Sequence, residues 1–138
     1  MERTTGESAV TIAPVLDSAE IIAIQRLVRR IPVSKGLVRS AVTLARMTRP
    51  VDAESPKFIR EFVEWGAGPR ASQYLVLGAK ARAAMDGRPM ADLDDVKTVA
   101  PAVLRHRIVT NFSAEAAERT SESLVTELVA SAAWDGRR

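Results

Sequence analysis

The sequence predicts an all-α protein, a small helical bundle of about five or six helices. Two observations predict this class. Apolar residues recur at helical spacing in several separate segments, and capping residues precede these segments while proline or glycine follows them. A third observation sets the size: 138 residues, with 46% apolar and 27% charged residues, suit one globular domain that can bury a core.

The predicted bundle covers residues 17–134, between a lead-in segment at 1–16 and a short tail at 135–138. The lead-in is polar at first and then apolar, with Pro14 near its end. Asp17 or Ser18 can cap the first helix, and Pro32 ends it. Its apolar stripe at helical spacing comprises Ile21, Ile22, Ile24, Leu27, Val28 and Ile31.

Ser34 can cap a second helix, which Arg49-Pro50 ends. Its predicted buried side comprises Leu37, Val38, Ala41, Val42, Leu44, Ala45 and Met47. A polar loop follows at 52–56. Residues 57–65 form either a short helix or an extended segment, and the pattern leaves both open.

The third main helix is predicted over residues 69–85, with Asp86-Gly87 as its stop. Its predicted apolar side comprises Ala71, Tyr74, Leu75, Gly78, the stem of Arg82 and Met85. Arg70 and Gln73 share the other side, three residues apart, so their side chains lie next to each other on the helix surface.

Asp92 can cap a fourth helix over residues 93–100. Pro101 interrupts the pattern and is expected to open a further helix over residues 102–109. A polar link at 111–118 follows. Thr120 or Ser121 then caps a last helix, whose apolar residues are Leu124, Val125, Leu128 and Val129.

The segment from Trp65 to Gln73 is the most informative in the chain. Gly66 and Gly68 allow backbone angles that other residues avoid, and Pro69 suits the first helical position. Arg70 then lies beside the unpaired N–H groups of a helix N-terminus, where a cation is unfavourable unless an anion is near. Two interpretations stay open: a phosphate site, or an ordinary helix start that carries an arginine.

Several chemistries are excluded or lack support. No G-x-x-x-x-G-K-[ST] loop is present, so the chain lacks the usual cradle for ATP phosphates. His106 is the only histidine and cysteine is absent, so we predict no metal site and no catalytic residue. Asp94 and Asp95 are expected to support a helix start, and the absence of cysteine, membrane spans and a signal segment favours the cytoplasm.

The charge pattern does not favour nucleic acid as a partner. The net charge is only +3, although the isoelectric point is about 9.8, and the basic residues are interleaved with acids. Nucleic-acid binders usually concentrate cations and add stacking aromatics, and aromatics are only 4% here. Another open alternative is a stand-alone helical adaptor that docks a protein through Phe58, Phe62 and Trp65.

Five segments in a fixed order resemble the C-terminal lid domain of MoxR-type AAA+ ATPases, to which magnesium-chelatase ATPase subunits are related. They are Thr48-Arg49-Pro50 and the stretches at 20–25, 65–72, 78–83 and 103–108. The most specific parts are Gly-Pro-Arg-Ala-Ser at 68–72, Gly-Ala-Lys-Ala at 78–81 and Leu-Arg-His-Arg at 104–107. The resemblance covers roughly residues 12–130.

The resemblance implies that Arg70 is the sensor-2 arginine, which reaches toward nucleotide phosphates from a helix that begins at Pro69. It implies a weaker role for Gln73 behind Arg70, and a surface at Arg105, His106 and Arg107 that could face a core or a neighbour. The parent protein would use ATP and Mg, while this chain alone would hold neither and would not be an ATPase.

The resemblance also implies partners. They are the AAA+ core of the same or a neighbouring subunit in a ring, and a protein client that the sequence does not identify. The P-loop core of about two hundred residues is absent from this sequence. We therefore expect either a fragment or a natural short product.

Overall fold

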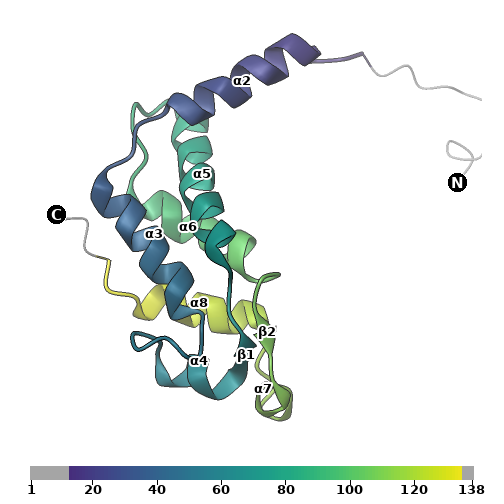
Figure 1. Ribbon diagram of the computed structural model, residues 1–138. Helices are drawn as coiled ribbons and strands as arrows, with labels where there is room; N and C mark the ends of the chain where they lie inside the picture. Colours follow the sequence, from purple (N-terminus) through teal and green to yellow (C-terminus); the bar gives the residue numbers. More distant parts are fainter. Residues whose placement is uncertain (1–12, 135–138) are drawn as a thin grey trace, which may run out of the picture.

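The computed structural model describes residues 13–134, which form seven helices and one two-stranded sheet. The predicted small helical bundle is therefore confirmed (Figure 1). Residues 1–12 of the predicted lead-in and the predicted tail at 135–138 lie outside the described residues. The helices are α2 (Ser18–Arg30), α3 (Lys35–Met47), α4 (Lys57–Phe62), α5 (Pro69–Met85), α6 (Leu93–Leu104), α7 (Phe112–Ala116) and α8 (Ser121–Ser131), and the strands are β1 (Val63–Trp65) and β2 (Val109–Thr110).

Helix α5 is the central element and packs against both α3 and α6. Its buried face consists of Ala71, Leu75, Ala79 and Ala83, each fully buried and four residues from the next. Small side chains let the helices approach closely: a Cβ added at Gly78 would lie 3.2 Å from Val99 of α6. Most of the remaining buried core comes from α3, α6 and α8, with Leu37, Leu44, Val96, Leu104, Leu124 and Leu128 among its largest side chains. Ile59 of α4 and Val63 of β1 also belong to it.

The predicted apolar side of this helix was partly wrong. Tyr74 is 47% exposed and Met85 is 86% exposed, so neither belongs to the buried face. The prediction favoured large side chains, whereas the bundle buries the alanines because they allow close helix packing. Arg82 does lie partly buried, and its guanidinium reaches Asp95 of α6.

Helix α6 continues through Pro101, so the predicted break at this residue and the separate helix at 102–109 were wrong. Proline removes one backbone N–H and so one helix hydrogen bond, but the fully buried Ala100 and Leu104 hold the helix on either side of Pro101. The Pro101 carbonyl still accepts from the Arg105 N–H at 3.1 Å. The chain then leaves the helix after Leu104 and forms strand β2.

The two strands form a small antiparallel pair in which Val63 faces Thr110 and Trp65 faces Val109, with a bulge between them. The segment at 57–65 is thus a short helix followed by a strand, which resolves the alternative left open by its pattern. The predicted polar link contains α7, which the Asn111 side chain caps through the Ala114 N–H.

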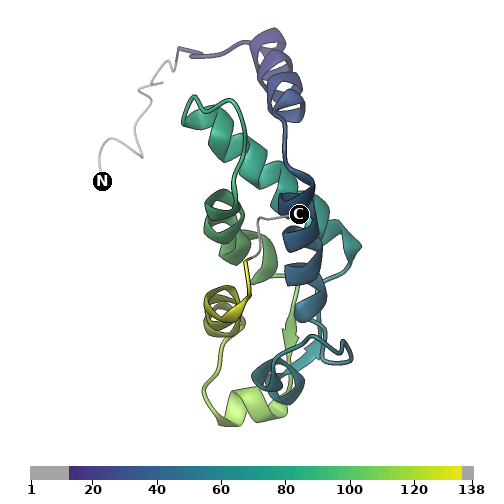
Figure 2. The ribbon, with the colours of Figure 1, turned by 90° about the vertical axis from the view of Figure 1, so that its left-hand side faces the viewer.

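Helix α2 projects from one end of the bundle and touches α5 there (Figures 1 and 2). Asp17 and Glu20 form a capping box at its start, as the cap prediction required. None of its residues is buried, and Ile21, Ile24 and Leu27 are each about half exposed. Periodicity correctly predicted an apolar stripe, but the stripe residues within α2 are not buried, and Ile31, directly after the helix, is the member that packs against the core.

No helix in residues 13–134 has both the length and the apolar character needed to cross a bilayer.

Candidate functional site

Helix α5 begins at the position that the sequence predicted. Gly68 is the N-cap and Pro69 the first helical residue, as predicted, and no side chain caps the first-turn N–H groups. Helices α2, α3, α6, α7 and α8 are all capped by side chains, namely Asp17, Ser34, Asp92, Asn111 and Thr120. The first turn of α5 also carries no acidic residue, so its positive end is not compensated locally.

Arg70 lies in this first turn with an exposed side chain. Among residues 13–134, no carboxylate lies within ion-pair distance of its guanidinium. Gln73 is also exposed, while the hydroxyl of Ser72 donates to the Pro69 carbonyl at 2.7 Å. The turn therefore presents backbone donors and one unpaired guanidinium, a combination that can bind a phosphate oxygen.

The turn before Arg70 is held by the end of α3. The Ala67 N–H donates to Thr48 Oγ1 at 2.8 Å, and Arg49 Nε donates to the Ala67 carbonyl at 2.9 Å. In the sequence, Thr48 and Arg49 belong to a segment that resembles the lid family, and no local pattern indicates a structural role for them. The two bonded residues, Thr48 and Ala67, are 19 positions apart, so the contact becomes visible only in the folded structure.

The role predicted for the two glycines needs correction. Neither has a positive φ, so unusual backbone angles are not the reason for glycine at either position. At Gly66 the reason is space, because a Cβ there would lie 2.5 Å from the Thr48 carbonyl oxygen. At Gly68 nothing lies within 4 Å of an added Cβ, and the φ of −77° suits any residue.

The cluster at 105–107 is divided between two faces. Arg105 is exposed and lies 3.7 Å from Glu122 of α8. Arg107 is partly buried, with its guanidinium 4.9 Å from the ring centroid of Tyr74 on α5, and it contacts exposed His106. Arg107 and Tyr74 thus lie on the same side of α5, one turn after Arg70, whereas Arg105 points elsewhere.

Two shallow grooves run along this exposed side of α5 and share Tyr74 and Leu77. One, of about 640 Å³, lies between α5 and α3 and includes Gln73, Val38, Val42, Arg29 and Lys80 in its lining. The other, of about 340 Å³, lies between α5 and the end of α6 and includes His106 and Arg107. Neither groove is lined by a carboxylate or by Arg70.

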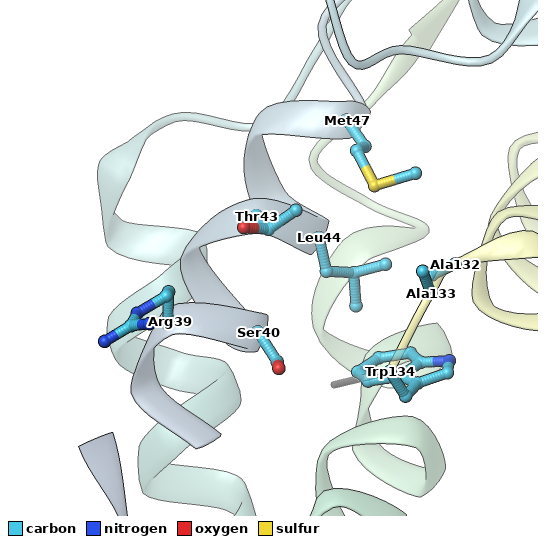
Figure 3. Close-up of a pocket in the computed structure, with 8 residues that line it drawn as sticks. All are labelled: Arg39, Ser40, Thr43, Leu44, Met47, Ala132, Ala133 and Trp134. Atoms are coloured by element: carbon cyan, nitrogen blue, oxygen red, sulfur yellow. The ribbon is translucent and has the colours of Figure 1, made fainter. Parts of the chain in front are cut away.

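A smaller hollow of about 120 Å³ lies where the segment after α8 returns to α3 (Figure 3). Arg39, Ser40 and Leu44 come from α3, and the Trp134 ring closes the other side. The Trp134 Nε1 donates to the Val129 carbonyl at 3.0 Å, so the ring is fixed as part of the packing. Since Arg39 is the only ionisable side chain in its lining, this hollow offers no catalytic constellation.

The far end of α5 is fixed by a buried carboxylate. Asp95, only 2% exposed, accepts from Arg88 Nη1 at 2.9 Å and from Arg82 Nε at 3.4 Å. Burial alone would raise the pKa of Asp95, but hydrogen bonds from Arg88 and from the Asp92 N–H outweigh it and hold the pKa below its ordinary value. Asp94 and Asp95 both lie in the first turn of α6, the position for which the sequence predicted a structural role.

The proposed adaptor strip is not present as one surface. Phe58 and Phe62 are partly buried against the core, and only Trp65 is largely exposed, at 68%. In residues 13–134 no cluster of three or more His, Asp or Glu side chains is arranged to hold a metal ion.

Comparisons with known proteins bear on the family and fold of the chain. Residues 57–128 match the model of the AAA lid domain family. The chain is 29% identical to the chaperone MoxR1 of Mycobacterium tuberculosis over 115 residues, which cover 83% of this chain and 30% of that protein. It is 27% identical to the uncharacterized protein YeaC of Bacillus subtilis over 119 residues, covering 86% of this chain and 34% of YeaC.

The fold also matches a solved structure. The crystal structure of a candidate ATPase from Cytophaga hutchinsonii superposes with a TM-score of 0.79 and 24% identity, covering 85% of this chain and 36% of that one. The chain thus spans about a third of the length of the curated relatives it matches.

Proposed function

Because this chain belongs to the AAA lid domain family, and is of the MoxR type that its sequence resembles, we propose that Arg70 binds the phosphates of a nucleotide held by a P-loop core. The P-loop core is not part of this chain. Hydrolysis would therefore be performed by a core in the same polypeptide or a neighbouring subunit, with this domain as its lid.

The observation that carries this proposal is the uncapped start of α5 with Arg70 in its first turn. A guanidinium can bind two phosphate oxygens at once. The helix N-terminus adds backbone N–H donors and a partial positive charge, which also favour an anion. The residues therefore fit an anionic ligand. Mg²⁺, which would neutralise phosphate charge in the same reaction, would be held by the core, as in other P-loop NTPases.

Arg70 would also report the state of the nucleotide. A contact with ATP phosphates that is lost after hydrolysis gives the two states different lid contacts, and this difference can bias the angle between lid and core. In a ring, such a change would act on the core of the same or the next subunit and, through it, on a protein client. Gln73 lies beside Arg70 on the exposed face and would support its orientation.

The test is ATP hydrolysis by this domain joined to a P-loop core, either its own or the core of MoxR1 fused ahead of it. Arg70→Ala should lower kcat at least tenfold without changing the folded state. Arg70→Lys should restore only part, since lysine keeps the charge but not the planar fork. Arg39→Ala removes another exposed arginine, on α3, and should hydrolyse ATP at the normal rate.

Unchanged hydrolysis in Arg70→Ala would overturn the proposal. A second measurement concerns the 138-residue chain by itself. Because it lacks a phosphate loop, calorimetry should detect no binding of ATP in the micromolar range. Micromolar affinity would mean that this chain binds nucleotide by a route other than the one proposed.

A further inference from the structure

The Thr48-Arg49-Pro50 segment ends α3 and has no part in the function proposed so far. We infer that Thr48 and Arg49 are positioning residues for Arg70: they fix the turn at 66–68 and so set where the first turn of α5 points. This inference rests on the proposed phosphate contact of Arg70 and adds the residues that make it possible.

Both polar groups of one residue in the turn are held by α3. The Ala67 N–H donates to Thr48 Oγ1 at 2.8 Å, and its carbonyl accepts from Arg49 Nε at 2.9 Å. The Thr48 hydroxyl donates its own hydrogen to the Ala45 carbonyl at 2.6 Å, so its lone pairs are left to accept from Ala67. Thr48 and Ala67 are both fully buried, which excludes water as a substitute partner.

The backbone of the turn also lies directly on the backbone of α3's end. A Cβ added at Gly66 would be 2.5 Å from the Thr48 carbonyl oxygen and 2.6 Å from Arg49 Cα. From the other side, Ser55 Oγ donates to the Arg49 carbonyl at 2.5 Å. The turn is therefore clamped to a rigid helix end, whereas its own helix start has no side-chain cap.

The clamped residue lies three positions before Arg70. Only Gly68 and Pro69 intervene, and the ring of Pro69 fixes one of their backbone angles. A shift of the Ala67 peptide would therefore be passed to Arg70 almost unchanged. Displacements of about 1 Å can cost about 100-fold in rate when a contact must be made in the transition state.

The first experiment examines the clamp in the 138-residue chain. Thr48→Val keeps the shape of the side chain but removes the hydroxyl, and should speed amide hydrogen exchange at Ala67 at least tenfold relative to exchange in the core of α5. Thr48→Ser should restore slow exchange. Arg49→Met, at a partly exposed position, tests the carbonyl side of the clamp if Thr48→Val fails to fold.

Arg46→Met is the matched control, because Arg46 lies on the same helix but its guanidinium pairs with Asp52 at 3.0 Å. It should leave both the Ala67 exchange rate and ATP hydrolysis unchanged. Slow exchange at Ala67 in both Thr48→Val and Arg49→Met would overturn the clamp itself.

The second experiment is a double-mutant cycle in the domain joined to a P-loop core. Thr48→Val and Arg49→Met should each lower kcat by about tenfold with a much smaller change in KM, as expected for lost transition-state contact. Combined with Arg70→Ala, neither should lower kcat further, because residues that act through one contact are not additive.

The outcomes separate the two proposals. Normal hydrolysis in Arg70→Ala would overturn the proposed phosphate contact. If Arg70→Ala is slow, then normal kcat in both clamp variants, or losses that add fully to the loss from Arg70→Ala, would overturn the positioning role alone.

Discussion

Replacement of Asp95 by asparagine should destabilise the domain by an amount that depends on pH. The Asp95 carboxylate is 2% exposed and accepts four hydrogen bonds: two from Arg88, one from Arg82 and one from the Asp92 N–H. Breaking a buried ion pair from one side costs about 3–5 kcal/mol. Because the Arg88 side chain is 32% exposed and can regain water, we expect about 3 kcal/mol, the lower end of that range.

The pH dependence follows from the pKa of Asp95. Burial raises this pKa, but the hydrogen bonds from Arg88 and the Asp92 N–H lower it by more. The pKa in the folded protein therefore lies below its ordinary value of 3.8. A carboxyl with a lowered pKa contributes its full stability above the unfolded-state value and loses it as the pH falls through the folded-state value. Asparagine does not titrate, so the gap between the two proteins should close in that acidic window.

Thermal unfolding followed by circular dichroism measures this gap. At neutral pH, Asp95→Asn should unfold about 10 °C below the parent chain, taking about 3–4 °C per kcal/mol for a domain of this size. Asp94→Asn is the control, since Asp94 is 83% exposed and pairs only with Lys97 at the surface. A gap that stays constant from neutral pH to well below pH 3.8 would refute the account of Asp95 as an ionised partner.

Two further predictions concern space and packing. Gly66→Ala should lower the melting temperature by at least several degrees, because its Cβ would overlap the Thr48 carbonyl, while Gly68→Ala, with open space around it, should change the melting temperature by about 1–2 °C at most. Equal effects in thermal unfolding would contradict the close approach at Gly66. Deleting residues 1–30 should leave the rest of the bundle folded with a similar melting temperature, since no residue of α2 is buried. Loss of sharp, dispersed amide signals in the NMR spectrum of the shortened chain would contradict this.

Local signals in the sequence were enough to place most helix starts. Asp17, Ser34, Asp92 and Thr120 all cap the helices they were expected to cap, because a cap depends on residues three positions apart. The start at Pro69 was predicted from a different local signal, the preference of proline for the first helical position.

Features that depend on distant residues were not accessible in this way. The pairing of β1 with β2 joins segments more than 40 residues apart, and strands of two or three residues are too short to show alternation. The contact of Thr48 with Ala67 likewise has no local pattern. Pro101 was misread because the packing of Ala100 and Leu104 in the core, which outweighs the one hydrogen bond that proline removes, has no local signal in the sequence.

The fixed points of α5 give the proposed nucleotide contact of Arg70 a way to act on the whole domain. The start of α5 is tied to α3 through Ala67, and its end to α6 through Asp95 and Arg88. Between these points an alanine face packs closely on both helices. A force on Arg70 would therefore turn α3, α5 and α6 together, because neither end of α5 can fray without breaking buried hydrogen bonds. Helix α2 is held less firmly: it has no buried residue, and it is tied to α5 by its contacts there and by the bond from Lys80 Nζ to the Arg29 carbonyl.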